Sequence, residues 1–356
     1  MADNHILFTG GGTAGHVIVN LALIPYFEEK GWQIDYIGSK DGIEKELVED
    51  IPSVTYHAIS TGKLRRYLSL DNIKDPFKVM KGILQSWNIL RKKKIDVVFS
   101  KGGFVSVPVV IAARLKRVPT IIHESDLTPG LANKIASKFA KKIVTTFPET
   151  VNYLPNQKTE HAGAVIRQEL YEGDPERGHT LLNGNTGKPV LLIMGGSIGS
   201  QNINETIRKN ITNLLENYQI VHICGKNNID DSIQQEGYTQ FEYVQEELKH
   251  IFSITDLVVS RAGANAIYEF LAMQLPMLLI PLSRAASRGD QIDNAKSFSN
   301  QGFANVLYEE DLTSDSFLRA IQQLSENATT IKVAMQEQES SEAEEKVLRL
   351  IQELKK

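Results

Sequence analysis

The chain of 356 residues contains a single cysteine, Cys224, so no disulfide can form within it. Its first residues, Met1 to His5, lack the basic segment and the apolar segment that a secretory signal combines. No apolar run approaches the roughly 18 residues that a membrane-spanning helix needs. These absences predict a cytosolic protein that does not span a membrane.

Recognisable metal ligands are also missing from the sequence. There is no D-x-D triplet, and no cluster of His, Cys and carboxylate residues has metal-ligand spacing. We therefore expect no metal and no cofactor. A bound diphosphate would instead be neutralised by backbone N–H groups and by arginine, for which Arg167 is the candidate.

Length and composition predict two domains. With 42% hydrophobic residues, the chain has enough apolar content for two cores. Short apolar segments alternate with helical stretches in both halves, and a polar stretch before Gly163 separates the two series. We expect α/β domains over residues 1–163 and 164–340, each built on a doubly wound parallel sheet.

The expected strands are short, and several are continuous apolar runs of the kind that parallel sheets bury on both faces. They cover residues 6–9, 33–37, 54–59, 96–100, 120–123, 143–146, 190–194, 220–224, 241–244, 257–260, 277–280 and 304–307. Val347, Ile351 and Leu354 follow helical spacing near the end of the chain. Residues 341–356 should therefore form a terminal helix that docks back on the first domain.

Three glycine-rich turns each follow an apolar strand directly, at residues 10–16, 101–104 and 195–200. A strand that ends in glycines and reopens as a helix presents free backbone N–H groups and the positive end of a helix dipole. This combination suits a phosphate or a diphosphate. Two turns lie in the first half and one in the second, which predicts a ligand cleft between two nucleotide-binding domains.

The first turn satisfies the G-x-G-x-x-G pattern through Gly10, Gly12 and Gly15, which alone would suggest a dinucleotide cofactor. That fingerprint also needs an acidic residue about 20 positions later to hold a ribose diol. Lys40 stands at the end of the second expected strand, which argues against a dinucleotide-dependent oxidoreductase. His16 begins the next helix, where the dipole favours a neutral imidazole. It is a candidate base, with capping of the turn as the alternative.

Polar residues follow further strands at the same edge of each expected sheet. Residues 123–126 read His-Glu-Ser-Asp, and residues 260–265 lead into the helix that carries Glu269. A carboxylate there can accept hydrogen bonds from both hydroxyls of a ribose, although glutamates near helix starts are also common for dipole reasons. Asp290 and Gln291 offer a carboxylate and an amide that suit sugar hydroxyls.

Positive charge is concentrated between Thr61 and Lys142, which hold 18 Lys and Arg against 5 Asp and Glu in a chain of net charge −4. Within this segment one helical stripe of large apolar side chains is flanked by lysines: Phe77, Met80, Leu84 and Trp87 with Lys78 and Lys81. A helix that lies on anionic lipid has this composition, and so does a helix buried on two sides. Nucleic-acid binding is less consistent, because stacking aromatics are missing elsewhere in the segment.

Together these motifs resemble the MurG family, the peptidoglycan glycosyltransferases that add N-acetylglucosamine to undecaprenyl-linked muramoyl pentapeptide. The resemblance runs over residues 10–307 and includes the three glycine turns, His123-Glu124, and the segment from Arg261 to Glu269. It implies the GT-B fold, with UDP-N-acetylglucosamine bound by the C-terminal domain and the lipid-linked acceptor by the N-terminal domain. The implied reaction is an inverting, metal-independent transfer to the C4 hydroxyl of the muramoyl sugar.

The resemblance also implies roles for individual residues. Glu269 would hold the ribose, Arg167 and Ser197 the diphosphate region, Gln291 the sugar and the Val244 backbone the uracil. His16 would be the base, and Asp126 would hold a hydroxyl or share that role. The other implied donor contacts are Thr13, Gly15, Ala264 and Asp290. The N–H groups assigned to the acceptor diphosphate are those of Gly12, Gly15, Gly102 and Gly103.

Membrane contact through the stripe at Phe77 to Trp87 is a further implication. The resemblance places the protein at the cytoplasmic face of the cell membrane, as a peripheral protein on anionic lipid. It implies cell-wall synthesis proteins as further partners and no nucleic acid.

Three positions depart from the family pattern. Ser125-Asp126 stands where Gln-Asn is usual, Asp290 where some members have glutamine, and Val19 where proline is frequent. These departures bear on the sugar contacts more than on the reaction class. The alternative function is another GT-B enzyme, either a diacylglycerol glycosyltransferase or a UDP-N-acetylglucosamine 2-epimerase.

Overall fold

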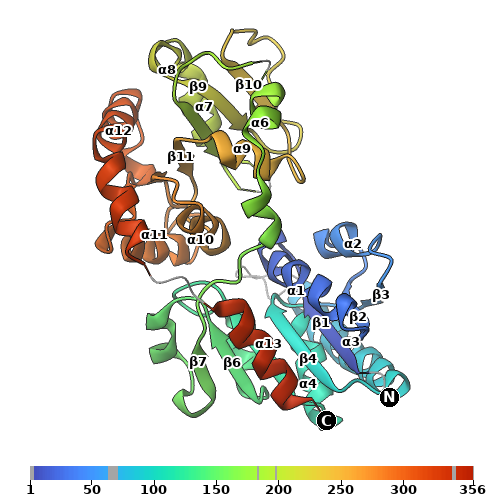
Figure 1. Ribbon diagram of the computed structural model, residues 1–356. Helices are drawn as coiled ribbons and strands as arrows, with labels where there is room; N and C mark the ends of the chain where they lie inside the picture. Colours follow the sequence, from blue (N-terminus) through green and yellow to red (C-terminus); the bar gives the residue numbers. More distant parts are fainter. Residues whose placement is uncertain (1–3, 63–70, 183, 197–198, 339–341, 356) are drawn as a thin grey trace. The chain divides into compact units, whose positions relative to one another are not determined.

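The computed structural model describes residues 4–62, 71–182, 184–196, 199–338 and 342–355, and it divides the chain into two compact units (Figure 1). One unit comprises Met1–Val165 together with Ser341–Lys356, and the other comprises Ile166–Ser340. Among the described residues, no helix combines the length and the apolar character that crossing a bilayer requires. Each unit is built around one parallel sheet, as the alternation of strands and helices predicts.

The sheet of the first unit has seven strands within the described residues, in the order β3-β2-β1-β4-β5-β6-β7, and all neighbours are parallel. The strands are β1 (His5–Gly10), β2 (Gln33–Ser39), β3 (Val54–Ile59), β4 (Val97–Gly102), β5 (Thr120–Glu124), β6 (Lys142–Thr145) and β7 (Thr159–His161). Because helices cover both faces, every side chain of β1 and β4 is buried.

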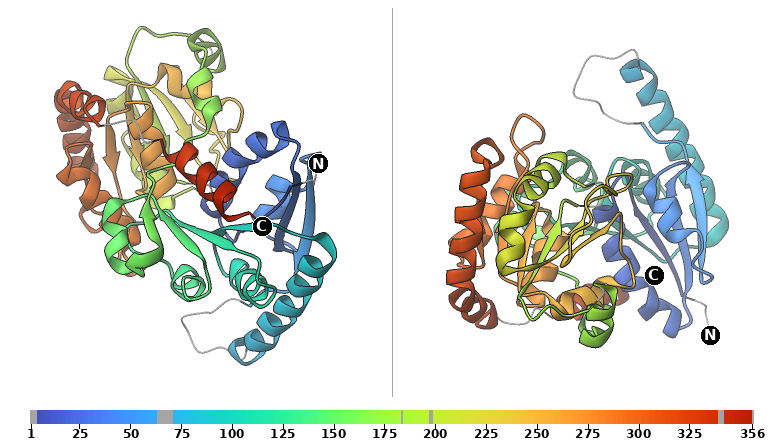
Figure 2. Two further views of the ribbon diagram at one scale, coloured as in Figure 1. Left: turned by 60° about the horizontal axis from the view of Figure 1, so that its bottom comes forward. Right: turned by 90° about the horizontal axis from the view of Figure 1, so that it is seen from above.

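Helices of the first unit lie on both faces of its sheet (Figure 2). They are α1 (Ile18–Glu29), α2 (Ile43–Val48), α3 (Asp71–Lys93), α4 (Ser106–Leu115), α5 (Leu131–Ala136) and α13 (Ala343–Leu354). The core on one face joins α1 and α13 to Ile6 and Phe8, and the core on the other joins α3 and α4 to Leu7 and Val98. The alternation of β1 side chains therefore serves two cores.

The last helix, α13, belongs to the first unit although the whole second unit precedes it in the chain. Val347 and Ile351 are fully buried in the core that contains Phe8 and Phe27. The amide of Gln352 also donates to the hydroxyl of Tyr26 on α1 at 2.6 Å. The apolar stripe read from the sequence is thus the face that α13 buries.

The second unit repeats the plan with six parallel strands, in the order β10-β9-β8-β11-β12-β13, within its described residues. The strands are β8 (Val190–Met194), β9 (Gln219–Ile223), β10 (Tyr238–Phe241), β11 (Leu257–Ser260), β12 (Met277–Leu279) and β13 (Ala304–Val306). The helices are α6 (Pro175–Leu181), α7 (Gln201–Lys209), α8 (Ile211–Asn217), α9 (Leu248–Ile254), α10 (Ala264–Ala272), α11 (Asp290–Asn300) and α12 (Ser314–Gln336).

The predicted fold class is confirmed, and two strands differ from the prediction. Strand β10 ends at Phe241 instead of starting there. Its first residue, Tyr238, is buried, and the Tyr238 hydroxyl lies 2.8 Å from Nδ1 of His222 on the neighbouring strand β9. Val244 lies buried in the loop after β10, which explains why its segment reads as a strand. Strand β7 was missed because its residues, Thr159–His161, are polar and pair only at the edge of the sheet.

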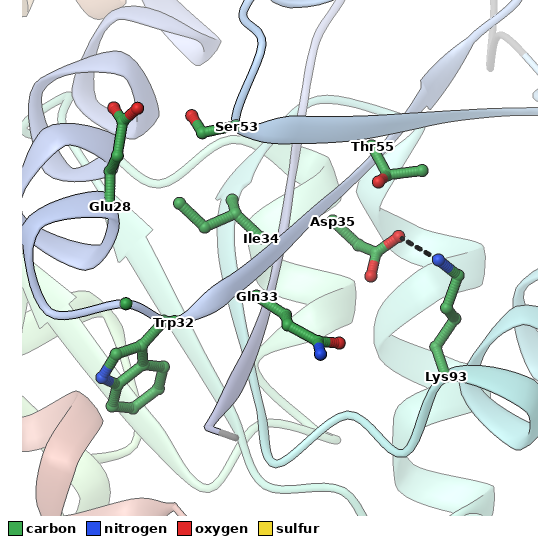
Figure 3. A pocket seen from close by; sticks show the side chains of 9 residues that line it. Glu28, Trp32, Gln33, Ile34, Asp35, Ser53, Thr55 and Lys93 are labelled. Carbon is green, nitrogen blue, oxygen red and sulfur yellow. Dashed lines mark ion pairs between the residues drawn. The ribbon is translucent and has the colours of Figure 1, made fainter.

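A buried carboxylate ties three strands together at the amino end of the first sheet. Asp35 on β2 contacts the Nε2 atoms of His5 on β1 and His57 on β3, and Lys93 lies 3.5 Å from Oδ1. Figure 3 shows Asp35 and Lys93 at the wall of a pocket of about 400 Å³. Burial alone would raise the pKa of Asp35, but the contacts with both histidines outweigh it and hold this pKa well below its usual value.

Asp35→Asn is expected to lower the free energy of unfolding by about 3 kcal/mol near neutral pH. The substitution removes the anionic partner of a buried polar cluster. The lowered pKa means that this stabilisation is fully present above the unfolded-state pKa, near 4, and is lost as the pH falls through the native-state pKa. Urea unfolding of wild type and variant at several pH values measures it. The exposed Asp41→Asn is the control; equal losses in both variants would contradict the role of Asp35.

Candidate functional site

Each sheet contains one position at which its strand order reverses, between β1 and β4 in the first unit and between β8 and β11 in the second. In open α/β sheets, ligands bind outside the carboxyl ends of the strands at this switch point. The three glycine turns follow β1, β4 and β8 directly. The structure therefore puts every one of them at a switch point, together with the loop that follows β11.

The first glycine turn holds Thr13 and His16 against each other. The Thr13 hydroxyl lies 3.0 Å from Nδ1 of His16, which ends a short 3-10 turn (Ala14–His16) before α1. When Nδ1 donates to this hydroxyl, Nε2 carries the lone pair that accepts a proton. His16 is half-buried and Thr13 exposed, so the pair lies near the surface at the carboxyl edge of the sheet.

The backbone N–H of Gly12 donates to Oε2 of Glu44 at 3.0 Å. The resemblance assigns this N–H to the acceptor diphosphate, whereas in the structure it faces a buried carboxylate, and the assignment of Gly12 remains a prediction. Sequence reasoning missed Glu44, since the search for an acidic residue stopped at the end of the second strand, where Lys40 stands. Glu44 lies four residues further on, in α2.

The second glycine turn packs against the first. Gly102 and Gly103 have φ values of +105° and +78°, and a Cβ atom on Gly103 would collide with the carbonyl oxygen of Gly11. Glycine is needed here because two backbones meet, whether or not a ligand also approaches. The acceptor-binding roles assigned to Gly102 and Gly103 remain predictions.

A buried lysine supports the loop that follows β5. Lys101 has 2% of its surface exposed, and its Nζ donates to the hydroxyl of Ser125. Burial lowers the pKa of Lys101, and the nearby Glu124 and Asp126 oppose that shift. Lys101 therefore hydrogen-bonds Ser125 and interacts electrostatically with Asp126, the two residues that depart from the Gln-Asn pattern.

Glu124 holds the same loop through hydrogen bonds to its backbone. Its carboxylate accepts hydrogen bonds from the backbone N–H groups of Asp126 at 3.1 Å and Gly130 at 3.0 Å. Asp126 itself is half-buried and follows β5 at the carboxyl edge of the sheet. The preceding His123 is fully buried beside Phe99, and burial, followed by the charge of Lys101, holds its pKa well below 6.5. His123 is therefore neutral and structural.

In the second unit, the structure brings together Arg167 and Glu269, which the sequence assigned to different ligand groups. Arg167 Nε lies 3.0 Å from Glu269 Oε1 and its NH1 lies 3.2 Å from Glu169. Burial raises the pKa of Glu269 more strongly than the ion pair with Arg167 lowers it. Glu269 sits in α10, whose first residue is Ala264.

Arg261 connects the loops at the carboxyl ends of four strands in the second unit. It donates to Ser200 Oγ at 2.7 Å and to the Ile280 carbonyl at 3.0 Å, and it pairs with Glu309. Glu309 accepts in turn from the backbone N–H of Ser283 at 3.2 Å. Sequence reasoning missed Glu309 because an acidic residue in a loop after the last strand carries no motif.

The remaining donor-site candidates lie on loops or helix starts of the second unit. Gln291 Oε1 accepts from the backbone N–H of Leu282 at 3.0 Å, which fixes the orientation of its amide. Asp290 begins α11 and lies 3.6 Å from Arg288. Val244 is buried after β10, and Ser197 lies outside the described residues.

The apolar stripe of α3 is divided between solvent and core. Phe77 is 71% exposed and Met80 and Leu84 are each 61% exposed, with Lys78 and Lys81 also exposed beside them. Trp87 differs from the prediction, because its ring packs against the core and lies under Arg91 and Lys116 at 5.2 and 5.3 Å. The exposed patch is therefore Phe77, Met80 and Leu84.

Within the described part of the chain, no group of three or more His, Cys, Asp or Glu side chains is arranged to hold a metal ion. The polar groups at the two switch points are instead backbone N–H donors, arginine, imidazole and carboxylates. Two doubly wound parallel-sheet domains with polar loops at their switch points are the plan of the GT-B glycosyltransferases, the class to which the comparisons assign this chain.

Comparisons with known proteins place the chain within that class. Residues 6–145 match the glycosyltransferase family 28 N-terminal domain, and residues 190–354 match the C-terminal domain of the same family. A protein of Oceanobacillus iheyensis is 58% identical over 354 residues, 99% of each chain, and one of Geobacillus kaustophilus is 56% identical over 349 residues, 98% of each chain. Both are named UDP-N-acetylglucosamine–N-acetylmuramyl-(pentapeptide) pyrophosphoryl-undecaprenol N-acetylglucosamine transferase.

The chain belongs to glycosyltransferase family 28 and, within it, to the MurG family. The structure of Acinetobacter baumannii MurG matches it with a TM-score of 0.75 at 24% identity, covering 98% of this chain and 99% of that one. A UDP-N-acetylglucosamine 2-epimerase matches with a TM-score of 0.67 at 12% identity, covering 99% and 95%. The fold is thus shared with the alternative enzyme class, and the full-length sequence identity separates the two.

Proposed function

We infer that the protein transfers N-acetylglucosamine from UDP-N-acetylglucosamine to undecaprenyl-diphospho-muramoyl-pentapeptide, which converts lipid I into lipid II in peptidoglycan synthesis. The observation that carries this inference is the 58% identity over 99% of both chains to a relative named for that transfer. The switch-point loops supply groups that fit it, because a sugar nucleotide needs anion-binding donors, a ribose acceptor and a base near the acceptor hydroxyl.

The proposed chemistry is a direct displacement with inversion. The C4 hydroxyl of the muramoyl sugar attacks the anomeric carbon, the bond from that carbon to the UDP oxygen breaks, and UDP leaves with the electron pair. Nε2 of His16 takes the hydroxyl proton, while Thr13 orients the ring through Nδ1. Asp126 is assigned to a sugar hydroxyl at the same edge. Backbone N–H groups and Arg167 stabilise the departing diphosphate, with no metal ion.

The donor is assigned to residues 164–340. Glu269 holds the ribose through Oε2, while Arg167 contacts Oε1 and reaches the diphosphate with its guanidinium. Gln291 and Asp290 contact the sugar, and the Val244 backbone contacts the uracil. The start of α10 at Ala264 and the turn that contains Ser197 complete this assignment.

The acceptor and the membrane are assigned to residues 1–163. The N–H groups of Gly15, Gly102 and Gly103 are assigned to the diphosphate of the acceptor. The exposed patch of α3 is assigned to anionic lipid at the cytoplasmic face of the membrane. Other cell-wall synthesis proteins are the proposed partners at that surface.

His16→Ala is expected to lower kcat by about 10²-fold or more, because a general base contributes that much. Labelled donor and lipid acceptor, with identification of the product and its anomeric configuration, measure the reaction and its inversion. Chelator should leave the wild-type rate unchanged. Formation of free N-acetylmannosamine, or transfer only to diacylglycerol, would favour the alternative enzymes. Near-normal turnover of His16→Ala would remove this residue from the mechanism.

Glu269→Ala is expected to weaken UDP binding by about tenfold, which corresponds to the loss of one charged hydrogen bond. Calorimetric titration with UDP measures this without the lipid acceptor. Glu205→Ala, on the exposed surface of α7, is the matched control. Unchanged UDP affinity in Glu269→Ala would refute the ribose assignment.

Replacing Phe77, Met80 and Leu84 by serine should reduce binding to vesicles that contain anionic lipid by about tenfold or more, because large apolar side chains leave the interface. Sedimentation with vesicles of phosphatidylglycerol and phosphatidylcholine measures the partition. The control replaces the exposed Tyr171 and Val333 by serine. Equal partition of the two variants would show that α3 is not the membrane surface.

A further inference from the structure

Glu44 is a fully buried carboxylate directly behind the first glycine turn. Its Oε2 accepts from the N–H of Gly12 at 3.0 Å, and its Oε1 accepts from the N–H and the hydroxyl of Ser39 at 2.8 and 2.5 Å. A Cβ atom on Gly11 would lie within 2.3–2.6 Å of the carboxyl atoms of Glu44, so a side chain there would displace this carboxylate. One side chain of α2 thus joins the turn after β1 to the end of β2.

The rest of the turn is held from the same side. The Tyr36 hydroxyl donates to the carbonyl of Gly10 at 2.8 Å, and Asn20 donates to Tyr36 at 3.1 Å. Tyr56 donates to the carbonyl of Ser39 at 2.6 Å. Asn20 and Tyr36 are completely buried, so this polar network excludes water from the back of the turn.

The network satisfies the turn with an internal anion. Burial alone would raise the pKa of Glu44, but the hydrogen bonds from Ser39 and Gly12 outweigh it and lower this pKa, so the group is ionised at neutral pH. In dinucleotide-binding folds the glycine turn gives its N–H groups to a pyrophosphate. Here a carboxylate of the chain itself occupies the N–H of Gly12.

We propose that Glu44 is a positioning residue, which fixes the first glycine turn so that Thr13 and His16 are held in their reactive arrangement. Glu44 touches neither substrate and acts through His16. This proposal rests on the proposed function in that it needs His16 to be the base.

Glu44→Gln tests the proposal kinetically. A glutamine has one oxygen and one NH2 group, so in either orientation a donor would face the N–H of Gly12 or of Ser39, and the turn would shift. We expect kcat to fall by about 10²-fold, as for a small misplacement of a catalytic group, with both KM values nearly unchanged. Glu46→Gln removes the same charge from the exposed face of α2 and should change neither parameter.

A double-mutant cycle separates positioning from a general loss of structure. In the His16→Ala background, Glu44→Gln should cause no further fall in kcat, because the group that it positions is gone. The same factor in both backgrounds would overturn the proposal. So would a lower acceptor KM with unchanged kcat in Glu44→Gln, since Glu44 would then be competing with the diphosphate for Gly12.

A substrate-free measurement keeps this test apart from the proposed function. The His16 ring resonance, assigned by its loss in His16→Ala, should shift or split in Glu44→Gln and stay unchanged in Glu46→Gln. An unchanged His16 resonance would overturn the positioning role even if transfer to the lipid acceptor is observed. A shifted resonance without any transfer would sustain the positioning and refute the proposed function. If Glu44→Gln does not fold, Ser39→Ala removes one donor to the same carboxylate and should shift the resonance less.

Discussion

Buried or half-buried carboxylates that accept hydrogen bonds from backbone N–H groups hold the loops at the carboxyl ends of both sheets. Glu44 holds the turn after β1, Glu124 holds the loop after β5, and Glu309 holds the loop after β12. A parallel sheet with helices on both faces sends all of these loops to one edge, where their backbone donors lack partners within regular structure. Each carboxylate supplies the missing acceptor. Because it is part of the protein, the loop is held whether or not a substrate is bound.

This arrangement has a cost and a benefit. An isolated buried charge is strongly unfavourable, and several hydrogen bonds to the charged form are needed to offset its desolvation. The lowered pKa values of Glu44 and Glu309 show that their partners do so. The benefit is rigidity at the place where a reaction needs fixed distances, because a turn bound by a charged hydrogen bond does not have to be ordered by the substrate.

Cationic side chains in both units are also held by hydrogen bonds or ion pairs within the protein. Lys101 is buried against Ser125, Arg261 against Ser200 and Glu309, and Arg167 against Glu269. Glu269, the partner of Arg167, is also the residue proposed to bind the ribose. The charge that would meet a diphosphate is therefore held in place before the ligand arrives, and the ion pair limits the cost of keeping Glu269 ionised inside the protein.

Sequence patterns predicted most of what regular hydrogen bonding and burial dictate. Continuous apolar runs gave the strands β1, β4, β8 and β11 their places, and the glycine turns after three of them marked the switch points. The predictions from sequence patterns were wrong where an apolar side chain is buried by tertiary contacts that local spacing does not reveal. Trp87 is partly buried against the core although its spacing puts it on the exposed stripe, and Val244 is buried in a loop although its neighbours read as a strand.

The amino-acid sequence by itself determined the fold class, the number of domains and the family, because these follow from local periodicity and from glycines that sit beside strands. Tertiary structure alone decided which polar groups face each other across tens of residues. Glu44 meets Gly12, Arg167 meets Glu269, and Arg261 meets Glu309, across separations of 32, 102 and 48 residues. Hydrogen bonds and ion pairs act over a few ångströms, and only the packed chain brings such distant residues that close.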